Sequence, residues 1–94
     1  MLSYNLKKTL TGMADRMKDI RINQLRIKQS EMALRMRVSR KTYIKMENAD
    51  ESVSLKSWLL AAEICLHLTD FDLLFKPKSL FDLVPEKEGR KRVR

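Results

Sequence analysis

The stretch that decides the fold is QSEMALRMRVSRKTYIKMEN, residues 29–48. Its apolar side chains recur at helical spacing in two short runs, which predicts two short helices joined by a tight turn. Met32, Ala33 and Met36 mark the inner face of the first helix, and Tyr43 and Met46 mark that of the second. A small residue such as Ala33 allows the two helices to approach closely where they cross.

The second of these helices has a clear start. Ser39 is a good N-cap, because its hydroxyl accepts a hydrogen bond from an amide of the first turn. The first helix has a weaker start, since Lys28 stands at its cap position, where a serine would contribute about 1 kcal/mol more. Ile27 precedes this cap and is expected to pack on Met32 as a hydrophobic staple.

Helices are also predicted before this unit. Met13, Met17 and Ile20 mark one face of a helix at about residues 12–25, with Thr11 as its cap. Residues 1–11 have no clear period, and they are interpreted as an N-terminal arm or a short strand.

The region after the unit contains the strongest amphipathic pattern in the chain. Ser54 or Ser52 caps the predicted helix there, and its inner face is formed by Leu55, Trp58, Leu59, Ala62, Cys65 and Leu66. Thr69 is expected to cap a fifth short helix, and Ser79 with Asp82 resembles a capping box for one more turn at residues 80–84. With no proline before Pro77, the sequence predicts an all-α domain of five helices, organised as an arm (1–11), a helical domain (12–75) and an extension (76–94).

The net charge of +8 is distributed unevenly along the chain. Residues 1–48 carry +8, residues 49–75 carry −4 and residues 76–94 carry +4. Small basic proteins are common, but this asymmetry concentrates the cations on the half with the two short helices, which favours a polyanionic partner.

The two short helices have the side chains needed to contact double-stranded DNA. Arg40, Lys41 and Thr42 lie in the first turn after Ser39, where arginine and lysine suit guanine O6 and N7 and threonine suits a thymine methyl group. Gln29 opens the preceding helix, where its amide and nearby N–H groups suit a phosphate. The alternative is a solvated cationic face on a structural helix. The predicted DNA-binding residues are Gln29, Ser39, Arg40, Lys41, Thr42, Ile44, Lys45 and Asn48.

These residues resemble the Cro/repressor-type (Xre) helix-turn-helix family over about residues 13–75. The resemblance rests on Gln29, Ala33, Val38, Ser39, Tyr43, Met46, Glu47, Asn48 and Leu55. It implies a five-helix domain whose third helix enters the major groove, and a dimer that binds a palindromic operator. Arg37 and Ala49 depart from the pattern, because the family often has glycine at both places. Glu47 is expected to form a surface ion pair with Arg35 or Arg37, a kind of pair that contributes only about 0–1 kcal/mol.

A narrower resemblance covers the last third of the chain. The run LLAAEICLHLTDFDLLFKPKSLFDLV and the ending GRKRVR are similar to the tails of HipB-like antitoxins, which are encoded beside HipA-type kinases. This resemblance implies a repressor that autoregulates a toxin–antitoxin operon and contacts a HipA-like kinase toxin or its accessory protein. A phage-type repressor with no toxin partner remains an alternative, as does an interaction module that neutralises a partner with DNA binding secondary.

The C-terminal third is rich in apolar side chains for so short a stretch. A chain of this size has difficulty burying all of them, so a homodimer interface is expected, with folding back onto the same domain as the alternative. The predicted interface consists of Phe71, Leu74, Phe75, Leu80, Phe81, Leu83 and Val84. The basic residues 90–94 follow, and they suit either phosphate contacts or a solubilising end.

Other classes of function have little support in the sequence. His67 is the only histidine and Cys65 the only cysteine, and neither a metal-ligand cluster nor a phosphate-binding glycine loop occurs. No catalytic residue, metal or cofactor is therefore expected, and the chain is predicted not to be an enzyme. RNA binding is disfavoured because aromatic residues are few. The longest apolar run, residues 58–62, is too short for a membrane span, so a cytoplasmic bacterial protein, nucleoid-associated when bound, is expected.

Overall fold

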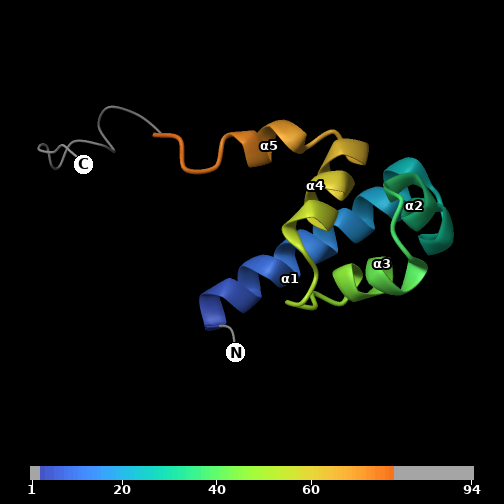
Figure 1. Ribbon diagram of the computed structural model, residues 1–94, viewed down its shortest axis with the longest axis horizontal. Helices are drawn as coiled ribbons and strands as arrows, with labels where there is room; N and C mark the ends of the chain where they lie inside the picture. Colours follow the sequence, from blue (N-terminus) through green and yellow to red (C-terminus); the bar gives the residue numbers. More distant parts are fainter. Residues whose placement is uncertain (1–2, 78–94) are drawn as a thin grey trace, which may run out of the picture.

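The computed structural model describes residues 3–77, which form five α-helices and one π-helical turn (Figure 1). The elements are α1 (Tyr4–Asp19), η1 (Ile20–Leu25), α2 (Gln29–Met36), α3 (Arg40–Glu47), α4 (Leu55–Ile64) and α5 (Leu68–Asp72). No strand occurs between residues 3 and 77. The prediction of an all-α domain of five helices is therefore confirmed at this level.

The first helix begins earlier than the sequence pattern indicated. Ser3 is the N-cap, and its Oγ accepts a hydrogen bond from the Leu6 amide at 3.2 Å. The predictions of an arm over residues 1–11 and of a cap at Thr11 are thus wrong, because α1 already covers residues 4–11. The error has a physical cause: Tyr4 and Leu6 are exposed, so the apolar residues of this segment do not mark a buried helical face.

The end of the first helix agrees with the prediction. The chain passes from α1 into the wider turns of η1, which ends at Leu25. Arg26 then takes a left-handed conformation with φ 56°, and this stops the helix.

The central helices begin and end as the sequence indicated. Ser39 caps α3 by accepting from the Thr42 amide at 3.0 Å, and Lys28 precedes α2 without a side-chain cap bond. Arg37 (φ 61°) and Ala49 (φ 56°) are both left-handed. These are the two positions at which the sequence departs from the glycine pattern, and each costs roughly 1–2 kcal/mol in a residue with a Cβ atom.

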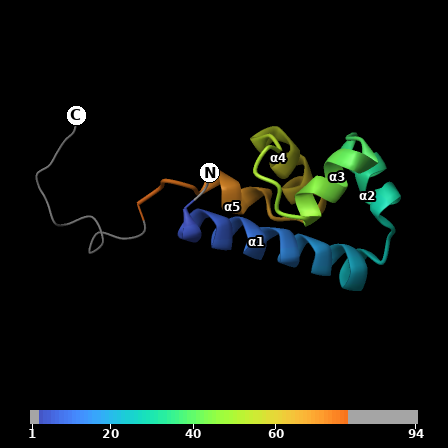
Figure 2. The ribbon, with the colours of Figure 1, turned by 90° about the horizontal axis from the view of Figure 1, so that it is seen from below.

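The core lies between α1 and the layer formed by the later helices, as Figure 2 shows with α1 along one side. The most deeply buried large side chains are Met32, Met36, Tyr43 and Met46, all at most 1% exposed. Ala14 and Met17 of α1 cover them from one side, and Trp58 and Ala61 of α4 join the same cluster. Residues 32–46 therefore contribute the centre of the hydrophobic core.

Two predictions for the C-terminal helices are wrong. Leu55 and Leu66 were expected to face inward, but they are 62% and 90% exposed, because Ala61 and Trp58 set the buried face of α4. The fifth helix begins at Leu68 after His67, and not after Thr69, because α4 ends at Ile64 and the left-handed Leu66 turns the chain directly into the new helix. Ser54 does cap α4.

No helix within residues 3–77 has both the length and the apolar content to cross a membrane.

Candidate nucleic-acid interface

Helices α2 and α3 pack against each other across a tight turn. Ala33 is 2% exposed where they meet, and its carbonyl accepts a hydrogen bond from the Val38 amide at 3.0 Å. The Arg37 amide bonds the Leu34 carbonyl at 3.1 Å, which closes the end of α2. The turn therefore fixes the direction in which α3 leaves α2.

The start of α3 presents cations to solvent. Arg40, Lys41 and Lys45 are exposed, whereas Thr42 and Ile44 are half-buried. Asn48 is exposed and forms the C-cap of the helix. The Ser39 hydroxyl is used within the protein, because it accepts from the Thr42 amide and donates to Thr42 Oγ1 at 2.9 Å. Seven of the eight predicted DNA-contacting residues thus lie on α3 or at its caps.

A hollow of about 520 Å³ lies where α2 and α3 begin. It is lined by Arg21, Lys28, Gln29, Ser30 and Arg40, so three of its five residues are cations. The first-turn N–H groups of a helix carry partial positive charge, and no side-chain cap hydrogen bond is made at the start of α2. Because the charge of Arg21 is paired with Glu47, Lys28 and Arg40 are the cations that make the hollow suitable for an anion such as a phosphate group.

Beneath this surface lies a network centred on the Glu47 carboxylate. Arg21 Nε donates to Glu47 Oε2 at 2.7 Å, Gln29 Nε2 donates to Glu47 Oε1 at 3.0 Å, and the Tyr43 hydroxyl donates to Oε2. Arg21 also donates to the Ile27 carbonyl at 2.9 Å. The side chains of Arg21 and Glu47 are only 10% and 4% exposed. One carboxylate thus links η1, the start of α2 and the end of α3.

The network corrects the expected pairing of Glu47. Its partner is Arg21, 26 residues earlier, and neither Arg35 nor Arg37. Arg35 instead pairs with Glu31 one turn away, at 2.8 Å. The sequence did not single out Arg21, because its neighbours in the chain do not distinguish it from the exposed arginines and lysines of the other helices. Only the packing of η1 against α3 brings it to Glu47.

The network also changes the expected role of Gln29. Its amide nitrogen is engaged by Glu47, so the side chain is held in place rather than free at the surface. A primary amide has two N–H donors, and one bond to Glu47 leaves the second for another acceptor. The geometry therefore shows an internal contact of Gln29 and leaves one donor for the predicted phosphate contact.

The ionisation equilibria agree with a charged network. Burial by itself raises the pKa of Glu47, but hydrogen bonds from Arg21, Tyr43 and Gln29 outweigh it and hold that pKa below its ordinary value. Burial and the bond to the carboxylate raise the pKa of the Tyr43 phenol well above its ordinary value. The hydrogen bond to Glu47 raises the pKa of Arg21 against the opposing effect of burial. Near neutral pH, Glu47 is therefore anionic and Tyr43 remains a donor.

The predicted dimer-interface residues divide into three groups. Phe71 and Leu74 line an apolar groove against α1 and α4, and Phe75 is fully exposed. Leu80, Phe81, Leu83 and Val84 lie outside the described residues, as do the basic residues 90–94.

His67 Nδ1 lies 2.7 Å from Asp70 Oδ2, and residues 3–77 contain no group of three or more potential metal ligands.

Comparison with known proteins gave no match to any family model, curated protein or solved structure. Over residues 3–77 the chain forms an all-α domain of five helices.

Proposed function

We propose that this chain is a sequence-specific DNA-binding transcriptional repressor, in which α2 and α3 act as a helix-turn-helix. The observation that carries the proposal is the cationic start of α3 beside the hollow at the start of α2 that Lys28 and Arg40 line. A duplex offers phosphates and base edges at the same time, and this surface has groups for both.

Each part of the surface has its own role in the proposal. Arg40 and Lys41 contact base edges or neighbouring phosphates, and Thr42 and Ile44 offer methyl groups to thymine. Lys28, Gln29 and the first amides of α2 hold a phosphate, which fixes how α3 enters the major groove. The Glu47 network sits behind Gln29, so it holds this phosphate contact in register with α3.

A palindromic operator would require two copies of the chain. Leu66, Leu73 and Phe75 are 90%, 50% and 101% exposed, and none of them lines the groove against α1. These outward side chains are suitable for a two-fold contact between copies.

Autoregulation as the antitoxin of a HipA-like kinase operon is the finer part of the proposal, and it rests on the resemblance of the C-terminal third. Co-expression with a kinase encoded next to this gene tests it directly. Co-purification of the two chains, retained by an Arg40→Ala/Lys41→Ala variant, would support the antitoxin role. Loss of co-purification would favour a repressor without a toxin partner.

The experiment that tests DNA binding is fluorescence anisotropy with the DNA upstream of the gene and a scrambled duplex, each at two salt concentrations. We expect selective, salt-sensitive binding by the wild type. Arg40→Ala/Lys41→Ala should lose it, since one base-contacting arginine contributes about 1–3 kcal/mol. The matched control Lys18→Ala/Lys76→Ala removes the same charge from outside the α2–α3 unit and should retain selective binding.

Two results would contradict the proposal. Equal binding to both duplexes would show that the charge provides only general phosphate affinity. Equal losses in the two double variants would show that the start of α3 has no special part in binding.

A further inference from the structure

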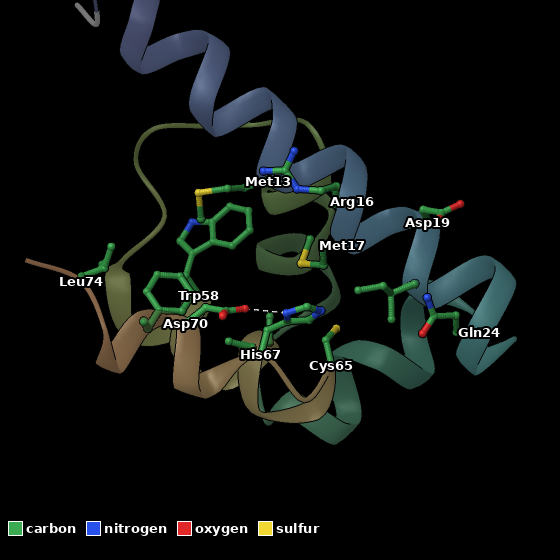
Figure 3. A pocket seen from close by; sticks show the side chains of 14 residues that line it. Met13, Arg16, Met17, Asp19, Gln24, Trp58, Cys65, His67, Asp70 and Leu74 are labelled. Carbon is green, nitrogen blue, oxygen red and sulfur yellow. Dashed lines mark hydrogen bonds and ion pairs between the residues drawn. The ribbon is translucent and has the colours of Figure 1, made fainter. Parts of the chain in front are cut away.

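An apolar groove of about 490 Å³ lies on the side of the domain formed by α1, α4 and α5. Figure 3 shows side chains from α1 and from the α4–α5 segment pointing into a common space. Met13 and Met17 form one wall, and Trp58, Cys65 and Phe71 form much of the other. Leu74 lies at the end of the groove where the described chain leaves the helices, and it is 53% exposed.

The groove has the size and lining of a binding site. Occupied sites are usually apolar hollows of roughly 300–1,000 Å³ with a few polar groups. The polar groups here include Arg16 and Asp19 on α1 and the His67–Asp70 pair on the opposite side. Asp70 is paired with His67, whereas no carboxylate within residues 3–77 forms a salt bridge with Arg16.

The chain itself supplies an apolar segment next to this groove. Four of the five residues 80–84 are apolar, in the order Leu-Phe-Asp-Leu-Val. Only residues 75–79 separate Leu74 from Leu80, and a tether of that length reaches at most roughly 20 Å. Packed helices lie about 8–10 Å apart, so the tether is long enough for the segment to turn back over the groove.

We propose that residues 80–84 of the same chain occupy the groove, with Phe81 and Leu83 against Trp58 and Cys65. Asp82 then lies among the groove residues and has Arg16 as a partner. The segment covers apolar surface that the domain would otherwise expose to water. Residues 80–84 thus belong to the domain itself, while Leu66, Leu73 and Phe75 remain outward for a second copy.

Cys65 provides a direct test, because it is the only cysteine and lies in the groove. The test measures how fast a thiol reagent labels Cys65 in the full chain. Leu80→Ser/Phe81→Ser/Leu83→Ser should raise this rate several-fold, because the apolar segment no longer shields the thiol. The matched control Glu86→Ser/Lys87→Ser/Glu88→Ser should leave the rate unchanged. Equal rates in the wild type and the apolar triple variant would overturn the proposal.

A second measurement distinguishes the same chain from a second copy as the occupant. Leu83→Cys is oxidised under mild conditions, with Val93→Cys as the control. A fast disulfide to Cys65 within one chain, independent of protein concentration, is the expected result. A two-chain product that dominates at low concentration would overturn the proposal in favour of exchange between copies.

Circular dichroism and Trp58 fluorescence check that the substituted variants remain folded. The core of residues 14–61 does not include the substituted residues, so helix content should be retained, and Trp58, which is 7% exposed within this core, should keep its emission wavelength. DNA binding by Arg40 and Lys41 does not depend on this groove, and the failure of either proposal leaves the other intact.

Discussion

The two ends of the domain differ in how completely they are closed. Around α2 and α3, Met32, Tyr43 and Met46 are 0% exposed, and an ion pair is buried beside them. Around α4 and α5, Leu66 and Phe75 are 90% and 101% exposed, and an apolar groove remains between the helices. The first region is closed by contacts among residues 3–77, whereas the second leaves apolar side chains exposed within that range.

This difference in closure suggests a difference in rigidity between the two regions. The closed region fixes the position of the cationic surface that we propose for DNA. Within the open region, α4 has four buried residues, whereas no residue of α5 is fully buried. Local stability follows the density of buried contacts, so α5 should open more easily than α3.

The largest effect should come from breaking the buried network. Glu47→Ala leaves the Arg21 guanidinium without its carboxylate at a site where both side chains are nearly buried. Loss of one partner of a buried pair costs about 3–5 kcal/mol, a large share of the roughly 5–15 kcal/mol that stabilises a small domain. Urea denaturation followed by circular dichroism measures this loss.

The matched control is Glu31→Ala, which removes an exposed carboxylate from the Glu31–Arg35 pair. An exposed pair contributes about 0–1 kcal/mol, so the free energy of unfolding should change little. Similar losses in the two variants would mean that the Arg21–Glu47 pair does not stabilise the closed region.

A comparable pair of substitutions contrasts the apolar side chains of the two regions. Met32→Ala should lower the free energy of unfolding by about 2–5 kcal/mol, because it leaves a cavity in a fully buried site. Phe75→Ala should change it by less than about 0.5 kcal/mol when measured on the monomer at low concentration. A large loss with Phe75→Ala would show that the Phe75 side chain is itself covered within the single chain.

The smallest effect concerns pH. The pKa of Glu47 in the folded protein lies below its ordinary value, so the carboxylate favours the folded state above its unfolded pKa of about 4.3. This stabilisation is lost as the pH falls through the lower, folded-state pKa. The difference in free energy of unfolding between the wild type and Glu47→Gln should therefore shrink on acidification, as urea titrations from neutral pH downward would show. A difference that stays constant with pH would contradict this account, and Glu31→Gln serves as the control.

Local chemistry explains which elements were predictable from the sequence. Ser39 was predicted as a cap, and Ser54 as one of two candidates with Ser52, because capping depends on a side chain and amides three residues away. Tyr43 and Met46 were recognised as buried because they lie on one helical face. The start of α1 at Ser3 was missed, since its first turns pack little and so show no apolar period.

The sequence predicted the exposed cations of the candidate site, but it did not predict the buried ion pair beneath them. The order of residues 39–45 alone places cations at the start of a capped helix. Arg40 and Lys41 could therefore be located in the first turn of α3 from the sequence. The pairing of Arg21 with Glu47 could not, because it spans 26 residues and depends on how η1 packs against α3.

The sequence by itself determined the helical class, the cap of α3 and the cationic start of α3, because each of these depends on neighbours within about one helical turn. Only the tertiary structure decided which apolar side chains of α4 and α5 are buried, which cation faces Glu47, and that a groove opens against α1. These features depend on contacts between segments far apart in the chain, and local periodicity carries no information about such contacts.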